Sequence, residues 1–356
     1  TEPIDQGLTT YYTDLVWGRI GVAVLEDRKF KSGCNRTDMP PSGTGRPDHF
    51  NDPEFDVDDL DVAGATLLGE QQLQFIDEFA QDWEGQLMKM AVSQTIFANM
   101  ATHHGRNLDR LIADLDSNGW PQSGRNRAVD ALRKGFIFHL GGDQHLATIV
   151  HHGIDTHGDA IWSFCVPSVA NFYPRAWAPE LEGEYSWPEP KTFTGPRYDG
   201  FGHPVTVYAA TNPGRSTGHE PQELHDKMPG YGIVRLDKTE RRITMECWPR
   251  SADPSMPGAK PYAGWPKTIR QTENYAPEPV GYLADLKVIG AESPVVQVVD
   301  ANTGDVAWTL RILGNEYRVP AIADREYHVI IRDGDNTQSL ENLKPVATPK
   351  ETRVRF

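Results

Sequence analysis

The sequence of 356 residues predicts an α/β fold followed by a smaller all-β module. Two observations predict the first part. Helical spacing alternates with short apolar runs, and the run at 136–140 ends in two glycines and a polar motif. One observation predicts the second part, since beyond residue 266 apolar alternation and turn residues replace helical spacing. We therefore expect a first unit at 1–250, a Pro-rich linker at 251–266 and a small immunoglobulin-like β-sandwich at 267–356.

The elements of the first unit follow from apolar patterning in chain order. Residues 11–26 hold two Val- and Ile-rich runs around a glycine, which predicts two short strands. Residues 34–62 are rich in proline, glycine and acidic residues. Because the acidic residues lack the spacing of an EF-hand, we expect a solvated loop there. Apolar residues at helical spacing predict helices over 69–83 and 125–134, and the run at 88–98 predicts a buried strand between them.

The remaining elements are predicted as strands by their β-branched and aromatic residues. They are expected at 136–140, 146–154, 205–210, in a hairpin over 232–248, in a second hairpin over 294–313, and at 317–319 and 327–331. In an α/β sheet the functional residues gather at the carboxyl ends of the strands. The residues that follow the 136–140 strand are therefore the first place to look for a site.

That position carries Gly141, Gly142, Asp143, Gln144 and His145 in succession. The two glycines allow the backbone to come close to whatever the following side chains hold. A carboxylate and an imidazole two residues apart can converge on one cation as mixed oxygen and nitrogen ligands. The alternative is an Asp in a turn beside a surface His, and the buried strand and the glycines favour the metal site.

The GGDQH motif at 141–145 resembles the last ligand motif of the PhoD-like alkaline phosphatases, which are calcineurin-like metallophosphoesterases. In that family a GD-x-H motif follows a core strand and supplies metal ligands, which match Asp143 and His145. LEDRKFKSG at 25–33 resembles the family's LDtRqyRs segment, and LLGEQQLQFIDEF at 67–79 resembles its lG-x-x-Q-x-x-wl helix.

Two further segments extend the resemblance in the same order. AVSQTIFA at 91–98 resembles the strand that follows the family's helix. DSNGWPQSGRNR at 116–127 resembles D-x-W-x-G-Y-x-x-x-R, although Trp120 is displaced and the Tyr is missing. The similar segments together cover about residues 10 to 180.

The resemblance implies a metallophosphatase-type α/β/β/α sandwich that is incomplete at its amino terminus. It implies a phosphate ester as substrate, a centre of two or more metals with iron and calcium as first candidates and zinc or manganese as others, and a periplasmic or extracellular location. The family's earlier ligand motifs, GD-x-x-Y and DDH-x-x-x-N, do not occur in the 24 residues before Leu25. We therefore expect a companion amino-terminal segment to supply the remaining ligands.

Other residues are candidates for the catalytic chemistry. His103 and His104 follow the 88–98 strand and could be a metal ligand, a proton donor or a phosphate contact, or ordinary loop histidines. Arg125 could bind a phosphate with two parallel hydrogen bonds, or form a surface ion pair. Asp116 and Asn118 fit caps of the second predicted helix.

Composition limits the partners. Lys and Arg number 35 against 50 Asp and Glu, a net charge of −15, which argues against nucleic acid or an anionic membrane surface as the main partner. No apolar run is long enough to span a bilayer. The three cysteines are scattered and odd in number, so they predict neither a disulfide framework nor a CxxC metal site.

Two functions follow from these observations. The first is a metal-dependent phosphatase that hydrolyses phosphomonoesters, phosphodiesters or both with metal-activated water. The second is a catalytically inactive metallophosphatase-like binding or surface protein. The missing early motifs favour the second function, and the GGDQH motif favours the first.

Overall fold

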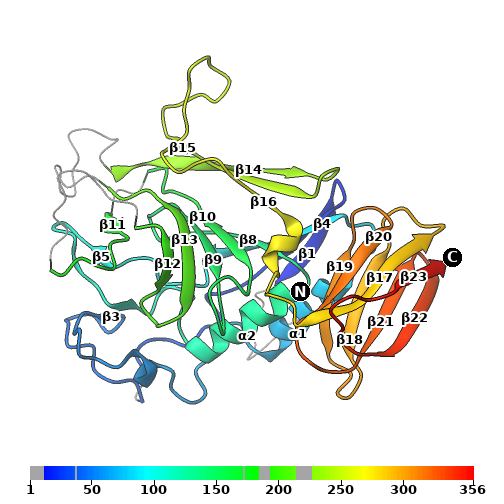
Figure 1. Cartoon of the computed structure of the whole chain (residues 1–356). Coiled ribbons are helices and arrows are strands. Elements are labelled where there is room, and N and C mark those ends of the chain that lie inside the picture. Colours follow the sequence, from blue (N-terminus) through cyan, green and yellow to red (C-terminus); the bar gives the residue numbers. More distant parts are fainter. Residues whose placement is uncertain (1–11, 37, 171–172, 184–192, 214–226) are drawn as a thin grey trace.

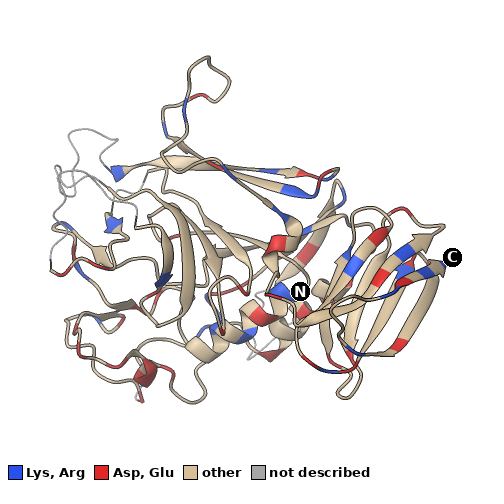
Figure 2. Ribbon diagram, in the orientation of Figure 1, with Lys and Arg blue, Asp and Glu red and all other residues tan. Residues whose placement is uncertain are grey.

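A computed structural model describes residues 12–36, 38–170, 173–183, 193–213 and 227–356. The described chain is mostly β-sheet with two α-helices, and it forms two bodies side by side (Figure 1). Charged residues of both signs are spread over both bodies, while the central strands of the larger sheet carry few of them (Figure 2). Neither described helix is long and apolar enough to cross a membrane.

The first body is built on an eight-stranded sheet with the order β1-β2-β4-β8-β10-β9-β13-β12. Its strands are β1 (Thr13–Trp17), β2 (Ile20–Val24), β4 (Met88–Thr95), β8 (Phe138–Gly142), β9 (Thr148–His152), β10 (Trp162–Cys165), β12 (Gly195–Tyr198) and β13 (Pro204–Ala210). The four strands β2, β4, β8 and β10 run parallel, and the other pairs are antiparallel. β8 is therefore flanked by parallel strands on both sides, and its carboxyl end lies beside those of β4 and β10.

Two helices connect the parallel strands and cover one face of the sheet (Figure 1). They are α1 (Glu70–Gln81), between β2 and β4, and α2 (Gln122–Arg133), between β4 and β8. Ile76 of α1 and Leu132 of α2 are fully buried in one cluster with Ala91 of β4. The helical spacing of the apolar residues predicted both helices, although α2 begins three residues before the predicted start at Arg125.

A three-stranded sheet covers the opposite face. It consists of β14 (Gly230–Asp237), β15 (Arg242–Pro249) and β16 (Lys267–Arg270). Met90 lies next to Ala91 in β4 and packs with Phe138 and Met245 on this second side, as the two-residue period of a strand requires. The layers are thus helices, large sheet and small sheet. The described residues contain no second helical layer, so the expected four-layer sandwich is not confirmed.

The second body consists of a three-stranded and a four-stranded sheet, in the orders β20-β17-β23 and β19-β18-β21-β22. Its strands are β17 (Gly281–Ile289), β18 (Val295–Asp300), β19 (Val306–Arg311), β20 (Glu316–Ala321), β21 (Tyr327–Asp333), β22 (Asn336–Leu343) and β23 (Glu351–Arg355). Their inner faces share one core around Trp308 and Val329. An all-β second body is what the sequence predicts, while the immunoglobulin-like type stays a prediction.

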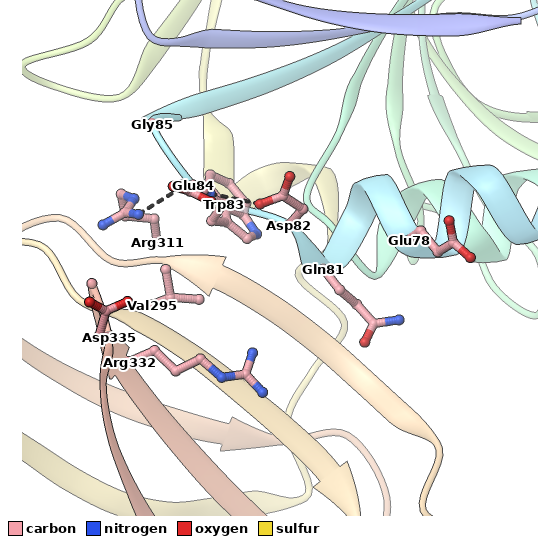
Figure 3. A pocket seen from close by; sticks show the side chains of 11 residues that line it. Glu78, Gln81, Asp82, Trp83, Glu84, Gly85, Val295, Arg311, Arg332 and Asp335 are labelled. Atoms are coloured by element: carbon pink, nitrogen blue, oxygen red, sulfur yellow. Dashed lines mark hydrogen bonds between the residues drawn. The ribbon is translucent and has the colours of Figure 1, made fainter.

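The two bodies are joined by packing as well as by the chain. Trp83 and Phe136 of the first body are buried in the core of the second. Arg311 Nη2 donates to the Trp83 carbonyl at 2.7 Å, and Thr309 N donates to the Lys134 carbonyl at 2.8 Å. A cavity of about 620 Å³ lies beside this contact, between the end of α1 and the arginine-bearing edge of the second body (Figure 3).

The segment predicted as a linker, 251–266, leaves and re-enters the first body. β16 follows it and pairs with β15 in register from Arg242↔Arg270 to Met245↔Lys267. The chain enters the second body only at β17. The division of the chain at 250 and 267 remains a prediction.

Candidate active site

Asp143 and His145 lie in the turn that follows β8. Both have positive φ angles, 62° and 54°. Gln144 between them is buried, where its Oε1 accepts from Met100 N at 3.0 Å and its Nε2 donates to the Ala98 carbonyl at 2.6 Å. Anchoring the middle residue in this way directs its two neighbours away from the core, and the Asp143 side chain is 45% exposed.

The two glycines before this turn have a packing role as well as the predicted one. A Cβ added at Gly141 would lie 2.9 Å from the carbonyl carbon of Thr95 in β4. No side chain fits at that distance, so Gly141 is required where β8 and β4 approach each other. The backbone at Gly141 therefore lies close to the neighbouring strand β4.

Arg28 holds two carboxylates together at this edge. Its Nη2 pairs with Asp143 Oδ2, its Nη1 donates to Asp116 Oδ1 at 2.6 Å, and its Nε donates to Gln94 Oε1 at 2.6 Å. Burial opposes the charge, but Asp116 and Asp143 outweigh it and raise the pKa of Arg28. The site thus places two anionic side chains around a single cationic group.

Lys31 fixes the backbone around Asp116. Its Nζ donates to the carbonyls of Leu115 at 2.7 Å, Asp116 at 3.1 Å and Ser117 at 2.7 Å. Burial lowers the pKa of Lys31 to about 8. Asp27 belongs to the same 25–33 segment as Lys31. Its side chain is fully buried and accepts a hydrogen bond from Asn118 Nδ2. The charged residues of the 25–33 segment therefore support the turn that carries Asp116.

His145 and His104 meet at Tyr173. His145 Nδ1 lies 3.2 Å from the Tyr173 carbonyl, and His104 Nδ1 lies 2.7 Å from the Tyr173 hydroxyl. Burial is the main reason why the pKa of His145 is lowered and that of His104 falls to about 4. Both imidazoles are therefore neutral near pH 7, the form that binds metals.

The donor set of this turn fits a metal ion. A carbonyl can accept only if His145 Nδ1 carries its hydrogen, which leaves the lone pair on Nε2 for a ligand. Histidines that bind metals are held in this manner by a carbonyl or a carboxylate. The partly exposed Asp143 carboxylate adds an oxygen two residues away. Asp143 and His145 are the residues that would hold an ion here.

The structure does not bring the other predicted residues to the same point. His103 shares the short strand β5 (His103–His104) with His104 and is buried, with its Nδ1 3.1 Å from Thr102 Oγ1. Arg125 is fully buried, and its guanidinium donates to the carbonyls of Phe97 at 2.9 Å and Gly153 at 2.7 Å. His104 contacts the Tyr173 hydroxyl, beside His145.

The predicted caps of the second helix are wrong. α2 begins at Gln122 after Pro121, so Asp116 and Asn118 lie too far ahead to cap it. Asp61 takes that role, because both of its carboxylate oxygens accept from Ser123 N, at 3.2 and 3.1 Å. The loop predicted at 34–62 thus contributes a long-range cap that no local pattern indicates.

Another group with metal-ligand chemistry was not indicated by the sequence. His49 and Asp114 pair in a two-stranded sheet formed by β3 (His49–Phe50) and β7 (Ala113–Asp114), and Asp48 directly precedes β3 and lies close to both. Strands of two residues leave no periodic pattern, and 62 residues of intervening chain separate β3 from β7 in sequence. The adjacent Asp48-His49 dipeptide was the one available signal.

No protein-family model matches the chain, and no curated protein matches it. Among solved structures, the structure of PhoD is similar to 44% of this chain and to 28% of its own chain, with 19% sequence identity and a TM-score of 0.31. Two structures with a TM-score this low need not share a fold.

Proposed function

We propose that this protein is a metal-dependent phosphatase that hydrolyses phosphomonoesters, phosphodiesters or both. The observation that supports it best is the pair Asp143 and His145 in one turn after a central parallel strand, with His145 Nδ1 facing a carbonyl. The proposal includes the PhoD-like relationship and the metallophosphatase-type sandwich that the sequence resemblance implies. Iron and calcium are the first candidate metals.

Each residue of the site has a proposed task. Asp143 and His145 would hold the metal, which when bound would activate water and neutralise phosphoryl oxygens. Arg28 lies between Asp143 and Asp116 and would exchange one carboxylate for a phosphoryl oxygen of the substrate. His104, neutral near pH 7, would contact the phosphate by a hydrogen bond rather than by charge.

The test is hydrolysis of p-nitrophenyl phosphate and bis-p-nitrophenyl phosphate by the natural polypeptide that contains these residues. We expect Asp143→Asn and His145→Asn each to lower the metal-dependent rate by roughly 100-fold or more, because loss of a ligand costs at least as much as loss of a residue that supports one. Asn suits the positive φ angles at both positions better than Ala does. Asp155→Asn, at an exposed loop position, is the matched control.

Melting temperatures separate this effect from misfolding. Asp143 is partly exposed beyond a strand end, so both variants should stay within a few degrees of the parent. Turnover near the parental rate in either variant would reject the ligand assignment. Absence of any metal-dependent hydrolysis in the parent would instead support the inactive binding protein.

We further propose that a companion amino-terminal segment completes the metal centre. The resembled motif supplies two ligands, whereas even a single catalytic zinc has about three protein ligands. Residues 1–356 purified alone should then be inactive with added iron, calcium, zinc or manganese. Full activity of the isolated chain would contradict the companion segment and leave the phosphatase proposal intact.

A further inference from the structure

We propose that Asp48, His49 and Asp114 bind one divalent cation, with Zn²⁺ as the first candidate, at a second site beside the one formed by Asp143 and His145. Each of the three residues offers one ligand atom, and these atoms all lie within 4.8 Å of one another. His49 and Asp114 are cross-strand partners in the β3–β7 pair, so backbone hydrogen bonding fixes their separation. The ligands would therefore be placed before any ion binds.

The His49 imidazole points into this group. Its side chain is 3% exposed, and its Nε2 lies 3.6 Å from Asp48 Oδ2 and 3.9 Å from Asp114 Oδ2. Among the described residues, His49 Nε2 has no hydrogen-bond partner. Leaving a buried polar atom unsatisfied is unfavourable. A cation between the three side chains would satisfy the nitrogen and both carboxylates at once.

The spacing suits a small cation. Two ligand atoms that each lie about 2.1 Å from a tetrahedral ion are roughly 3.4 Å apart. The distances from His49 Nε2 to the two carboxylates, 3.6 and 3.9 Å, need small side-chain shifts to match, and all three ligand atoms lie within 4.8 Å of one another. Imidazole nitrogen and carboxylate oxygen are both ligand types that zinc accepts, and three protein ligands leave a fourth position for water.

Two arginines neutralise the carboxylates when no ion is bound. Arg46 Nη2 lies 2.5 Å from Asp48 Oδ2, and Arg175 Nη2 lies 2.9 Å from Asp114 Oδ2. The Arg46 side chain is 56% exposed and can turn into solvent, whereas that of Arg175 is 13% exposed and is held in place. Arg46 is thus a competitor that the cation displaces, and its removal should tighten binding.

A bound ion would tie the 34–62 loop to the rest of the first body. β3 is the strand that this loop contributes, and Asp114 precedes the turn that carries Asp116. Asp114 Oδ1 also accepts from Asp116 N at 3.0 Å. The second ion would therefore hold the position of Asp116, one of the two carboxylates on Arg28.

The experiment isolates this site by first removing the other one. The natural polypeptide with Asp143→Asn and His145→Asn is the background, treated with EDTA and titrated with Zn²⁺ by calorimetry, with Co²⁺ absorption reporting coordination. We expect one equivalent of bound Zn²⁺. Adding His49→Asn should weaken binding by about 100-fold or more, and adding Arg46→Ala should strengthen it. The matched control is His151→Asn, a mostly buried histidine of β9 that should leave binding unchanged.

Three results would overturn the proposal: no Zn²⁺ bound by the background, unchanged affinity after His49→Asn, or unchanged affinity after Asp114→Asn. If His49→Asn fails to fold by far-UV circular dichroism, Asp48→Asn takes its place, because that side chain is 18% exposed and tolerates substitution better. The readout is ion binding in a background already without Asp143 and His145. Failure of the phosphatase proposal would therefore leave this result unaffected.

Discussion

At the scale of single residues, the first body contains a directional chain of buried hydrogen bonds headed by Arg125. Arg125 Nη2 lies 3.2 Å from His152 Nδ1, so that nitrogen must accept and His152 Nε2 must donate, to Ser163 Oγ at 2.7 Å. Ser163 then donates to His139 Nδ1 at 2.9 Å. Arg125, a candidate phosphate contact by sequence, instead fixes the tautomers of two buried histidines.

The most sensitive residue near the site should be Gln144. We expect Gln144→Met to lower the free energy of unfolding by about 2 to 4 kcal/mol, because it leaves Met100 N and the Ala98 carbonyl buried without a partner. The same change should lower metal affinity, since the turn loses its anchor. Urea denaturation measures the first effect, and Zn²⁺ titration in a His49→Asn background measures the second. Gln74→Met on the exposed face of α1 is the control, and an equal loss there would contradict this role.

At the scale of elements, the order and type of the two helices and of most strands of the eight-stranded sheet could be predicted from the sequence, whereas β10 and β12 could not. Apolar spacing suffices for α1, α2, β4 and β8, because each buries one face or both. β3, β5 and β7 have two residues each and depend on tertiary contacts. The turn that carries Asp143 and His145 could be located because it follows a core strand. The Asp48 group could not, since its members meet only through such short strands.

The contact between the two bodies is an element-scale feature with a clear energetic consequence. Phe136 packs edge-on against Trp308, with ring centroids 5.8 Å apart. Phe136→Ala should lower the free energy of unfolding by about 3 to 5 kcal/mol, since it leaves a cavity in the shared core. Urea denaturation checks the value. Leu15→Ala on the exposed edge strand β1 is the control and should change stability little.

A truncated chain should be stable only if it keeps the pairing of β15 with β16. A chain that ends at Glu278 keeps β16, whereas one that ends at Pro266 loses the buried Ile269 and opens the small sheet. We expect the shorter chain to be less soluble and to melt at a lower temperature. Both should bind a fluorescent dye for apolar surface, because Trp83 and Phe136 become exposed. A shorter chain as stable as the longer one would favour the boundary predicted at 266.

At the scale of the whole molecule, buried histidines should make the fold sensitive to acid. Burial is the main cause that lowers the pKa of His103, His104 and His151 to about 4 and of His139 to about 3. In the unfolded chain the pKa is about 6.5. Below that pH the unfolded state binds protons that the native state does not. Stability should therefore be constant above about pH 6.5 and fall progressively towards pH 4.

Urea midpoints at pH 7, 6 and 5, measured with EDTA present, test this expectation. His151→Phe should reduce the slope of the free energy of unfolding against pH between pH 6 and pH 5. The reduction should reach at most the contribution of one bound proton, because Phe can keep the stacking on Trp162 while the titrating group is removed. A midpoint that does not change from pH 7 to pH 5 would contradict the prediction.

The shared core of the two bodies also bears on how the chain is made. Trp83 and Phe136 are synthesised early, but the core that buries them is closed by strands up to Val354. Ribosomes add about 5 to 20 residues per second, so Trp83 is synthesised roughly 15 to 50 seconds before the core is completed at Val354. During that interval two large aromatic side chains have no place to pack. We therefore expect the nascent first body to expose these two aromatic side chains to chaperones until the second body is synthesised.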